Sequence, residues 1–351
     1  MKVLFRYTGF PLSPRMAHFT GHAGKWCWWC IYDILKGLGH DVTPHDWNLP
    51  VPNEKYDAVF SIQHLQGIEP ACTPDTIKIM RLTMADPVYH NHMMDQRVEI
   101  VSYRKNAKLV VRRKLQLHHD HYKSIEQADY VIMNGNDYNR RTYPEHLRHK
   151  IHLANTAAAN IKDKPDMRTF IPKARHFLWH AGSGAIHKGL DLCLEVFAKH
   201  PEWTLHITGN LKHEPDFIRA YDKELNLPNV LYHGWMLVAD RKFKMMLENV
   251  FAFINPTCSE GQSPAVATCL SLGLYPIISR YTGVDLPEGC GLFIEELTID
   301  CVEEMVGKAM AMSNKELLRQ VQITQADALE KYSREKFRET MAYHIKEALG
   351  A

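Results

Sequence analysis

The sequence predicts an α/β protein with two domains, each built on a parallel sheet, that face one another across a cleft. The chain has 351 residues, more than the usual size of one domain. It opens with a strand, a glycine-containing loop, a helix and a strand, and such a βαβ unit implies a parallel sheet. The same alternation starts again after a polar segment with two prolines at residues 162–174.

The composition is that of a globular protein with sizeable cores. Apolar residues make up 45% of the chain, and its net charge of +2 gives no argument for a nucleic-acid partner. No apolar run approaches the roughly 18 residues that suggest a membrane span. Residues 1–7 resemble a strand and lack the cleavage site of a signal peptide. Eight scattered cysteines favour a reducing, cytoplasmic setting over a disulfide scaffold.

The first half is expected to form one domain over residues 1–162. A helix is expected at residues 26–38, where apolar residues recur at helical spacing and Gly39 follows. Strands are expected at residues 2–7, 40–43, 56–62, 77–83, 128–134 and 150–153. Because ligands of such sheets lie beyond the carboxyl ends of the strands, the candidate ligand-binding residues here are 21–25, Asp86 and 134–136.

The second half is expected to form another domain over residues 175–332, after a linker at residues 163–174. Strands are expected at residues 176–180, 203–208, 230–234 and 250–254, and helices at 190–199, 216–225 and 241–248. A final helix from residue 333 to 349 carries Phe337, Met341, Ile345 and Leu349 on one face.

The stretch at residues 255–279 has the clearest functional pattern, because it reads as loop, helix and strand after a short apolar run. Pro264 suits the first turn of a helix, and Gly273 suits its end. Small residues before a helix leave backbone N–H groups unpaired, and phosphate is the usual ligand of such groups. An ordinary βα turn has the same pattern. Glu260, however, would repel phosphate directly and suits a neighbouring group rich in hydroxyls.

Two further clusters favour structural readings. Cys27 and Cys30 form a C-x-x-C pair that could serve redox chemistry or half a zinc site. Without a second such pair, we interpret them as small buried residues on an apolar helix. His118, His119 and His121 cannot share one helix face, so we expect them on a solvated surface.

Residues 97–114 carry seven basic side chains against one acid, with apolar residues between them. A segment of this kind can dock on an anionic membrane or hold an anionic acceptor. A solvated helix face would give the same pattern, and both interpretations stay open.

Residues 176–295 resemble the donor-binding half of GT-B glycosyltransferases of family 4, the glycosyl transferases group 1 superfamily. Residues 181–191 match that family's Gly-Arg-x4-Lys-Gly-x-Asp loop, and residues 255–279 match its Pro-Ser-x-x-Glu-Gly-x-Gly loop with the helix and strand that follow. Residues 209–210 and 230–235 match the elements between them, and the first half matches more loosely. The resemblance implies two Rossmann-like domains, with the acceptor on the first, the donor on the second and residues 333–351 crossing back to the first.

The resemblance also implies an activity. This is a retaining transfer, without an essential metal or a cofactor, from a nucleotide sugar to a polysaccharide, oligosaccharide or glycolipid. Glu260 would bind donor-sugar hydroxyls, Lys188 would neutralise the leaving group, and N–H groups of residues 261–263 would hold the distal phosphate. The full donor-binding set is Gly182, Ser183, Gly184, Lys188, Gly209, Asn210, His233, Ser259, Glu260, Gly261, Gln262, Ser263 and Thr268, and the acceptor-side set is Gly21, His22 and Asp86.

Three positions depart from the family pattern. The family's arginine is Ser183 here, and His187 or Arg280 could replace the lost cation. The second glutamate of the E-x7-E pattern is Thr268, which offers the nucleotide ribose one hydroxyl. The histidine of the first half is Ala85. The nucleotide is therefore expected to be UDP or GDP, with CMP as a third candidate because one phosphate needs less neutralisation.

Two other functions remain open. A transferase that has lost catalysis could persist as a nucleotide-sugar-binding or glycan-binding protein. Retention of Glu260 and Lys188 argues against this loss, whereas Ser183 and Thr268 argue for it. A GT-B sugar-nucleotide epimerase would convert the nucleotide sugar without any acceptor.

Overall fold

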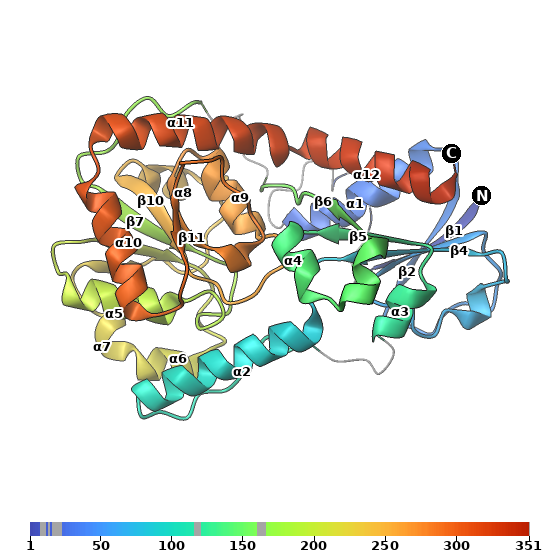
Figure 1. Cartoon of the computed structure of the whole chain (residues 1–351), viewed down its shortest axis with the longest axis horizontal. Coiled ribbons are helices and arrows are strands. Elements are labelled where there is room, and N and C mark those ends of the chain that lie inside the picture. The colour runs from blue at the N-terminus through green and yellow to red at the C-terminus, as the bar shows by residue number, and fades with distance from the viewer. Residues whose placement is uncertain (8–11, 13–14, 16–22, 116–120, 160–165, 351) are drawn as a thin grey trace.

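The computed structural model describes residues 1–7, 12, 15, 23–115, 121–159 and 166–350. It confirms the predicted fold class, because the strands form two six-stranded sheets in which every pairing is parallel. Figure 1 shows the two sheets at opposite ends of the long axis, each flanked by helices.

The first sheet has the order β2-β1-β3-β4-β5-β6. Its strands are β1 (Lys2–Tyr7), β2 (Asp41–Asp46), β3 (Ala58–Ile62), β4 (Ile77–Leu82), β5 (Tyr130–Asn134) and β6 (Ile151–Ala154). Its helices are α1 (Ala23–Gly37), α2 (Pro87–Arg104), α3 (His121–Gln127) and α4 (Asp137–Thr142), with short 3-10 helices η2 (Glu69–Ala71) and η3 (Glu145–Lys150). The central strands are near-continuous apolar runs because both faces of a parallel sheet are covered.

The second sheet has the order β12-β11-β10-β7-β8-β9. Its strands are β7 (His176–His180), β8 (Leu205–Thr208), β9 (Val230–Tyr232), β10 (Val250–Asn255), β11 (Tyr275–Ser279) and β12 (Leu292–Ile294). Its helices are α5 (Leu190–Lys199), α6 (Pro215–Ala220), α7 (Asp222–Leu225), α8 (Arg241–Leu247), α9 (Pro264–Ser271), α10 (Ile299–Ala311) and α11 (Asn314–Lys331), with η4 (Arg280–Thr282). The strand order reverses between β7 and β10, which opens a crevice at their carboxyl ends.

Elements differ from the prediction where tertiary contacts intervene. The single helix expected at residues 216–225 is two short helices, because Tyr221 leaves the helical conformation. The Tyr221 hydroxyl instead bonds with the Arg104 guanidinium and the Glu195 carboxylate.

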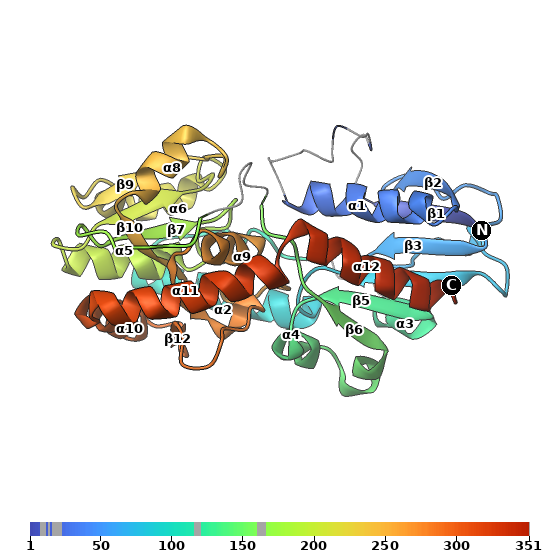
Figure 2. The same ribbon diagram turned by 90° about the horizontal axis from the view of Figure 1, so that it is seen from above.

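The C-terminal helices connect the two domains. α11 packs on α9 of the second domain, whereas α12 (Arg334–Leu349) packs on α1 of the first. Figure 2 shows the two helices running one after the other along both domains. Phe337, Met341 and Ile345 of α12 are fully buried beside Trp26 of α1. The apolar face read from the sequence therefore covers the first sheet.

α2 connects the domains in the other direction. It belongs to the first half of the chain, yet Met94, Val98 and Val101 join the apolar core of the second sheet. Figure 1 shows α2 lying along α6 and α7 of the second domain. The core of the second domain therefore includes residues from the first half.

The basic segment at residues 97–114 lies in this connection. Arg97 and Arg104 both pair with buried Asp191 (2.6 and 2.8 Å), and Lys105 pairs with Glu224 (2.7 Å). Arg112 pairs with Asp216 at 2.5 Å. These four side chains are therefore paired with acids of the second domain, and contact of this segment with an anionic membrane stays a prediction. Within the described residues, no helix has the length and apolarity needed to cross a membrane.

The two cysteines of the C-x-x-C pair are buried in α1, in agreement with the structural reading. Burial raises the pKa of both thiols, that of Cys30 to about 12, so neither is a thiolate at neutral pH. The surface position expected for His121 is wrong, because His121 is buried at the start of α3. His118 and His119 lie outside the described residues.

Candidate active site

A cavity of about 600 Å³ lies between the domains. Its wall on the second domain includes Lys188, Glu260 and Ser263, and its wall on the first domain includes Arg81 and Arg113. The second-domain wall lies beyond the carboxyl ends of β7 and β10, where the strand order reverses. Ligands of doubly wound sheets bind at this position.

The loop after β7 is held in a fixed shape. Glu214 accepts hydrogen bonds from the backbone N–H groups of Gly184 (2.7 Å) and Ala185 (3.0 Å). Gly189 has a φ of +68°, and a Cβ there would lie 2.3 Å from the Pro256 carbonyl oxygen, so only glycine fits. The two loops of the site are therefore packed backbone against backbone. Gly182 and Ser183 of this loop line the cavity.

Lys188 and Glu260 form a buried ion pair at the floor of the cavity. Each is 8% exposed, and the ammonium of Lys188 contacts Oε1 of Glu260. Burial and the Arg113 guanidinium lower the pKa of Lys188, whereas contact with a carboxylate favours the charged ammonium. Glu260 has no cation near it in the sequence, but the fold brings the Lys188 ammonium into contact with it. A ligand that presented an anion to Lys188 and hydroxyls to Glu260 would satisfy both groups.

The amino end of α9 faces the same cavity, since Ser263, Pro264 and Ala265 line it. No side chain caps this helix, and the buried Ser263 hydroxyl has no hydrogen-bond partner among the described residues. The helix dipole and these polar groups favour an anion there. The prediction that the Ser263 N–H faces phosphate is wrong, because this N–H donates to the Thr282 carbonyl oxygen (2.9 Å).

The loop at residues 260–263 is also a contact between the two domains. The Glu260 carbonyl oxygen accepts from the Ala85 N–H (3.1 Å) and the Asn139 side-chain amide (2.9 Å). Gln262 accepts from the Thr156 N–H at 2.6 Å. A Cβ on Gly261 would lie 2.3 Å from the Thr83 carbonyl oxygen. Both domains therefore fix the backbone of the loop that carries the Glu260 carboxylate.

Arg113 is a site residue that the sequence reasoning missed. It comes from the first domain, and its Nη1 donates to the Ser183 hydroxyl at 3.1 Å. Its side chain packs on Gly184, where a Cβ would lie 2.5 Å from the Arg113 Cδ. Arg113 has a φ of +65°, a conformation that costs about 1 kcal/mol or more in a non-glycine residue. A guanidinium therefore stands beside Ser183, the position at which the expected arginine is missing.

Neither proposed substitute for that arginine takes this role. Burial lowers the pKa of His187 well below its ordinary value, so this imidazole is neutral. Arg280 makes two hydrogen bonds with Glu295, at 2.8 and 2.7 Å, on the surface. The basic run at residues 112–114 was visible in the sequence, but its contact with Ser183 crosses between domains.

Of the other predicted donor residues, Thr268 lines the cavity, whereas Gly209, Asn210 and His233 lie outside its lining. Thr268 lines the cavity, but its hydroxyl donates to the Pro264 carbonyl oxygen (2.6 Å) and accepts from the Ala159 N–H (2.9 Å). Asn210 and Gly209 do not line the cavity; the Asn210 N–H instead bonds with the Gly182 carbonyl oxygen (2.9 Å) and so supports the loop. His233 also lies outside the lining and shares a hydrogen bond with His206.

Of the predicted acceptor residues, Asp86 is described, and it does not line the cavity. Asp86 caps α2, where its carboxylate accepts from the N–H groups of Val88 and Tyr89, both at 3.0 Å. Gly21 and His22 lie outside the described residues. For Asp86, a structural role replaces the predicted one.

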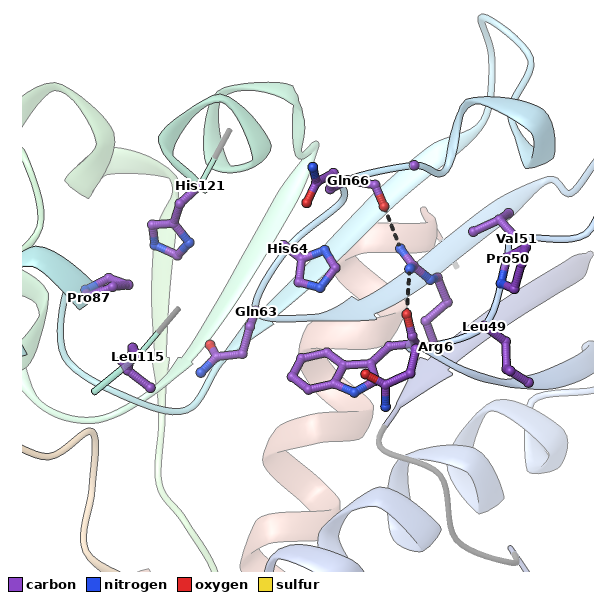
Figure 3. Close-up of a pocket in the computed structure, with 13 residues that line it drawn as sticks. Arg6, Leu49, Pro50, Val51, Gln63, His64, Gln66, Pro87, Leu115 and His121 are labelled. Atoms are coloured by element: carbon purple, nitrogen blue, oxygen red, sulfur yellow. Dashed lines mark hydrogen bonds between the residues drawn. The ribbon is translucent and has the colours of Figure 1, made fainter. Parts of the chain in front are cut away.

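A second cavity of about 630 Å³ lies within the first domain (Figure 3). Trp47, Gln63 and Leu115 line both cavities, so the two spaces adjoin. Trp47 stacks on His64 with 5.4 Å between ring centroids. The Arg6 guanidinium donates to the carbonyl oxygens of Gln66 and Trp47. This space can receive a ligand that extends from the interdomain cavity.

The described residues contain no group of three or more histidine, cysteine or acidic side chains placed to hold a metal ion. The cations that line the interdomain cavity are Arg81, Arg113 and Lys188.

No family model matches this sequence, and no curated protein matches it. Solved structures match over almost the whole chain. WaaG, a glycosyltransferase involved in lipopolysaccharide biosynthesis, aligns with a TM-score of 0.62 at 15% identity, over 99% of this chain and 100% of that chain. The chain has the GT-B fold.

Two other GT-B structures give the same result. Anabaena HepE, solved with UDP and glucose, aligns with a TM-score of 0.61 at 11% identity, over 100% of this chain and 99% of that chain. Sucrose-phosphate synthase from Thermosynechococcus elongatus aligns with a TM-score of 0.59 at 12% identity, over 99% of both chains. At these identities the likeness establishes the GT-B fold alone.

Proposed function

We propose that this protein is a glycosyltransferase that moves a sugar from a nucleotide-sugar donor to a glycan or glycolipid acceptor. The observation that carries the proposal is the buried Lys188–Glu260 pair beside the amino end of α9, in a cavity between two GT-B domains. One cation, one carboxylate and one helix terminus supply complementary groups for phosphate and for sugar hydroxyls. Similar structures solved as glycosyltransferases support this proposal.

The donor phosphates would lie between Lys188, Arg113 and the amino end of α9. Two cations and a helix terminus suit the charge of a diphosphate, so we propose UDP or GDP over CMP as the nucleotide. The Glu260 carboxylate would accept hydrogen bonds from hydroxyls of the donor sugar. The resident ion pair would then exchange its internal contact for contacts with the two parts of the donor.

In the proposed transfer, the bond between the anomeric carbon and the phosphate oxygen breaks, and its electron pair stays on the phosphate. The acceptor hydroxyl oxygen bonds to the anomeric carbon on the same face, and its proton passes to the departing phosphate. Lys188, Arg113 and the α9 dipole stabilise the developing negative charge, which lets the reaction proceed without a metal. Positioned charges of this kind are a large catalytic contribution.

We propose that residues 1–162, together with the helix at 333–351, receive the acceptor, and that residues 175–332 bind the donor. The aromatic second cavity within the first domain supports this assignment. We also propose a cytoplasmic location, for which the eight free thiols are the support.

Nucleotide release from a panel of UDP-, GDP- and CMP-sugars, without acceptor, tests the proposal. The wild type should release one nucleotide slowly by transfer to water. Lys188→Ala and Glu260→Ala should lose this activity by a factor of about 100 or more, as expected when a group that stabilises the transition state is removed. His146→Gln, an exposed site, is the control. Equal release in all four proteins would refute the assigned roles.

The same assay separates the alternatives. Binding of a nucleotide sugar without any release, even with acceptors present, would support the non-catalytic binding protein. Thr268 favours that alternative, because its hydroxyl is already bonded within the protein. Conversion of the donor sugar to its epimer, seen by NMR, would support the epimerase.

A further inference from the structure

Arg81 is a buried cation that has no carboxylate partner in the described part of the chain. It lies on β4, is 3% exposed and lines the interdomain cavity. Its Nε and Nη2 donate to the side-chain amide oxygen (Oδ1) of Asn134 at 2.9 and 2.5 Å. Its Nη1 has no hydrogen-bond partner among the described residues.

A comparison with Arg97 shows why this is unusual. Arg97 is also 3% exposed, but its guanidinium pairs with Asp191 at 2.6 Å and it does not line the cavity. Removing an ion from water without a counter-ion is unfavourable. The face of Trp28, whose ring centroid lies 4.1 Å from the guanidinium carbon of Arg81, offsets part of this cost. The neutral Asn134 amide adds no opposite charge.

The charges that face the cavity also leave Arg81 without a partner. Among the described residues that line the cavity, the cations are Arg81, Arg113 and Lys188 and the acid is Glu260, which leaves an excess of two positive charges. Glu260 is already in contact with Lys188. The proposed donor phosphates occupy Lys188, Arg113 and the α9 terminus, all grouped around the loop of the second domain.

We propose that Arg81 binds an anionic group of the acceptor, a carboxylate or a phosphate, so that the protein selects an acidic sugar or a phosphorylated acceptor. The assignment of the bound anion to an acceptor rests on the proposed transferase function, whereas the anion site itself rests on the observations of Arg81. The planar guanidinium is suited to carboxylate and phosphate oxygens. The adjoining cavity at Trp47 gives such an acceptor room to extend into the first domain.

Calorimetric titration of the full chain tests this inference with three probes: methyl glucoside, methyl glucuronide and glucose 6-phosphate. One of the two anionic probes should bind at least 10-fold more tightly than the neutral one, and which one does so identifies the anion. Arg81→Gln should remove the difference, and Arg81→Lys should keep part of it. Arg140→Gln removes an exposed cation from the same domain and should change nothing. Equal binding of all three probes by the wild type would overturn the inference.

Titration of the same variants with UDP keeps the two proposals apart. Arg81→Gln should bind UDP as the wild type does. If it loses UDP affinity instead of the preference for acid, Arg81 serves the donor and the inference is wrong. If the wild type prefers the acidic probe but binds no nucleotide, the transferase proposal fails and the anion site stands. If Arg81→Gln does not fold, the preference of the wild type must still weaken as salt is raised, and a salt-independent preference would overturn the inference.

Discussion

At the scale of single residues, the site depends on charges brought together from distant parts of the chain. Lys188 and Glu260 come from the two loops of the second domain, and Arg113 comes from the first domain. The sequence suggested that a cation is missing at Ser183. In the fold, the guanidinium of Arg113 from the first domain lies beside Ser183. Under the proposed function, the departure from the family pattern is a change in which domain supplies the charge.

Arg113→Asn tests this role of Arg113. Asparagine tolerates a positive φ, so the backbone should be retained while the charge is lost. Nucleotide affinity or nucleotide release should fall about 10- to 100-fold, in line with the loss of one charge-assisted hydrogen bond of about 1.5–3 kcal/mol. The neighbouring exposed pair of Lys114 with Asp95 supplies the control, Lys114→Gln. Equal losses in the two variants would show that Arg113 acts only through net charge.

At the scale of elements, the loop between β10 and α9 has two tasks. It carries Glu260 into the cavity, and its backbone touches the first domain at Thr83 and Ala85. The sequence predicted this loop and the start of α9 at Pro264, because proline, small residues and Gly273 are strong local signals. It could not reveal the second task, since the partners lie far away in the chain, in the loop between β4 and α2.

Gly261→Ala should separate the domains at this loop. Its Cβ would lie 2.3 Å from a backbone oxygen, which cannot move as a side chain can. We expect a loss of about 1–3 kcal/mol in stability, as for an overpacked core, and a larger proportional loss of nucleotide release. Gly307→Ala in α10, where a Cβ meets nothing within 4 Å, should be neutral or stabilising by up to about 1 kcal/mol. Thermal unfolding of both variants measures these changes in stability. A Gly261→Ala protein with the stability of the wild type would contradict the close packing at this loop.

The contact of α2 with the second domain should respond to acid. Burial lowers the pKa of His90 to about 4, and the ring of His90 lies 5.2 Å from that of buried His187. Between pH 6.5 and 4 the unfolded state therefore binds more protons than the folded state, so stability falls as pH falls through this window. For His90 alone the loss is about 2 kcal/mol by pH 5.

Thermal unfolding at pH 7.5 and pH 5 checks this expectation. His90→Gln removes the titration and keeps an N–H that can bond with the Arg113 carbonyl oxygen, the present partner of His90. The variant should lose less stability than the wild type between the two pH values. His146→Gln, at an exposed site, should behave as the wild type does. The idea fails if all three proteins show the same pH dependence.

At the scale of the whole molecule, the sequence predicted much of the architecture. Apolar strands followed by amphipathic helices, with the pattern starting twice, correctly implied two parallel sheets. Two helices, α2 and α12, each pack on the other domain, and the sequence predicted this for α12 only. The apolar face of α12 could be read from Phe337, Met341 and Ile345. The basic residues at 97–114 left both a membrane contact and a solvated face open, because the acids that pair with them, such as Asp191 and Glu224, lie in the other half of the chain.

The site was predicted to a similar degree. Lys188, Glu260 and Ser263 do line one cavity. Local motifs are enough for such residues, because the loops that carry them follow adjacent parallel strands. Arg81, Arg113 and Trp47 were missed because their part in the cavity depends on how the two domains meet. Thr268 also lines the cavity, but no local pattern shows that its hydroxyl bonds with Ala159.

The central claim is that the cavity between the domains binds a nucleotide sugar through Lys188 and the amino end of α9. Titration of the wild type and Lys188→Ala with UDP, GDP and CMP tests it most directly, because a transferase must bind its nucleotide whatever its sugar and acceptor. We predict that the wild type binds UDP or GDP and that Lys188→Ala weakens this binding at least 10-fold. A wild type that binds none of the three nucleotides, or a variant that binds as well as the wild type, would contradict the account.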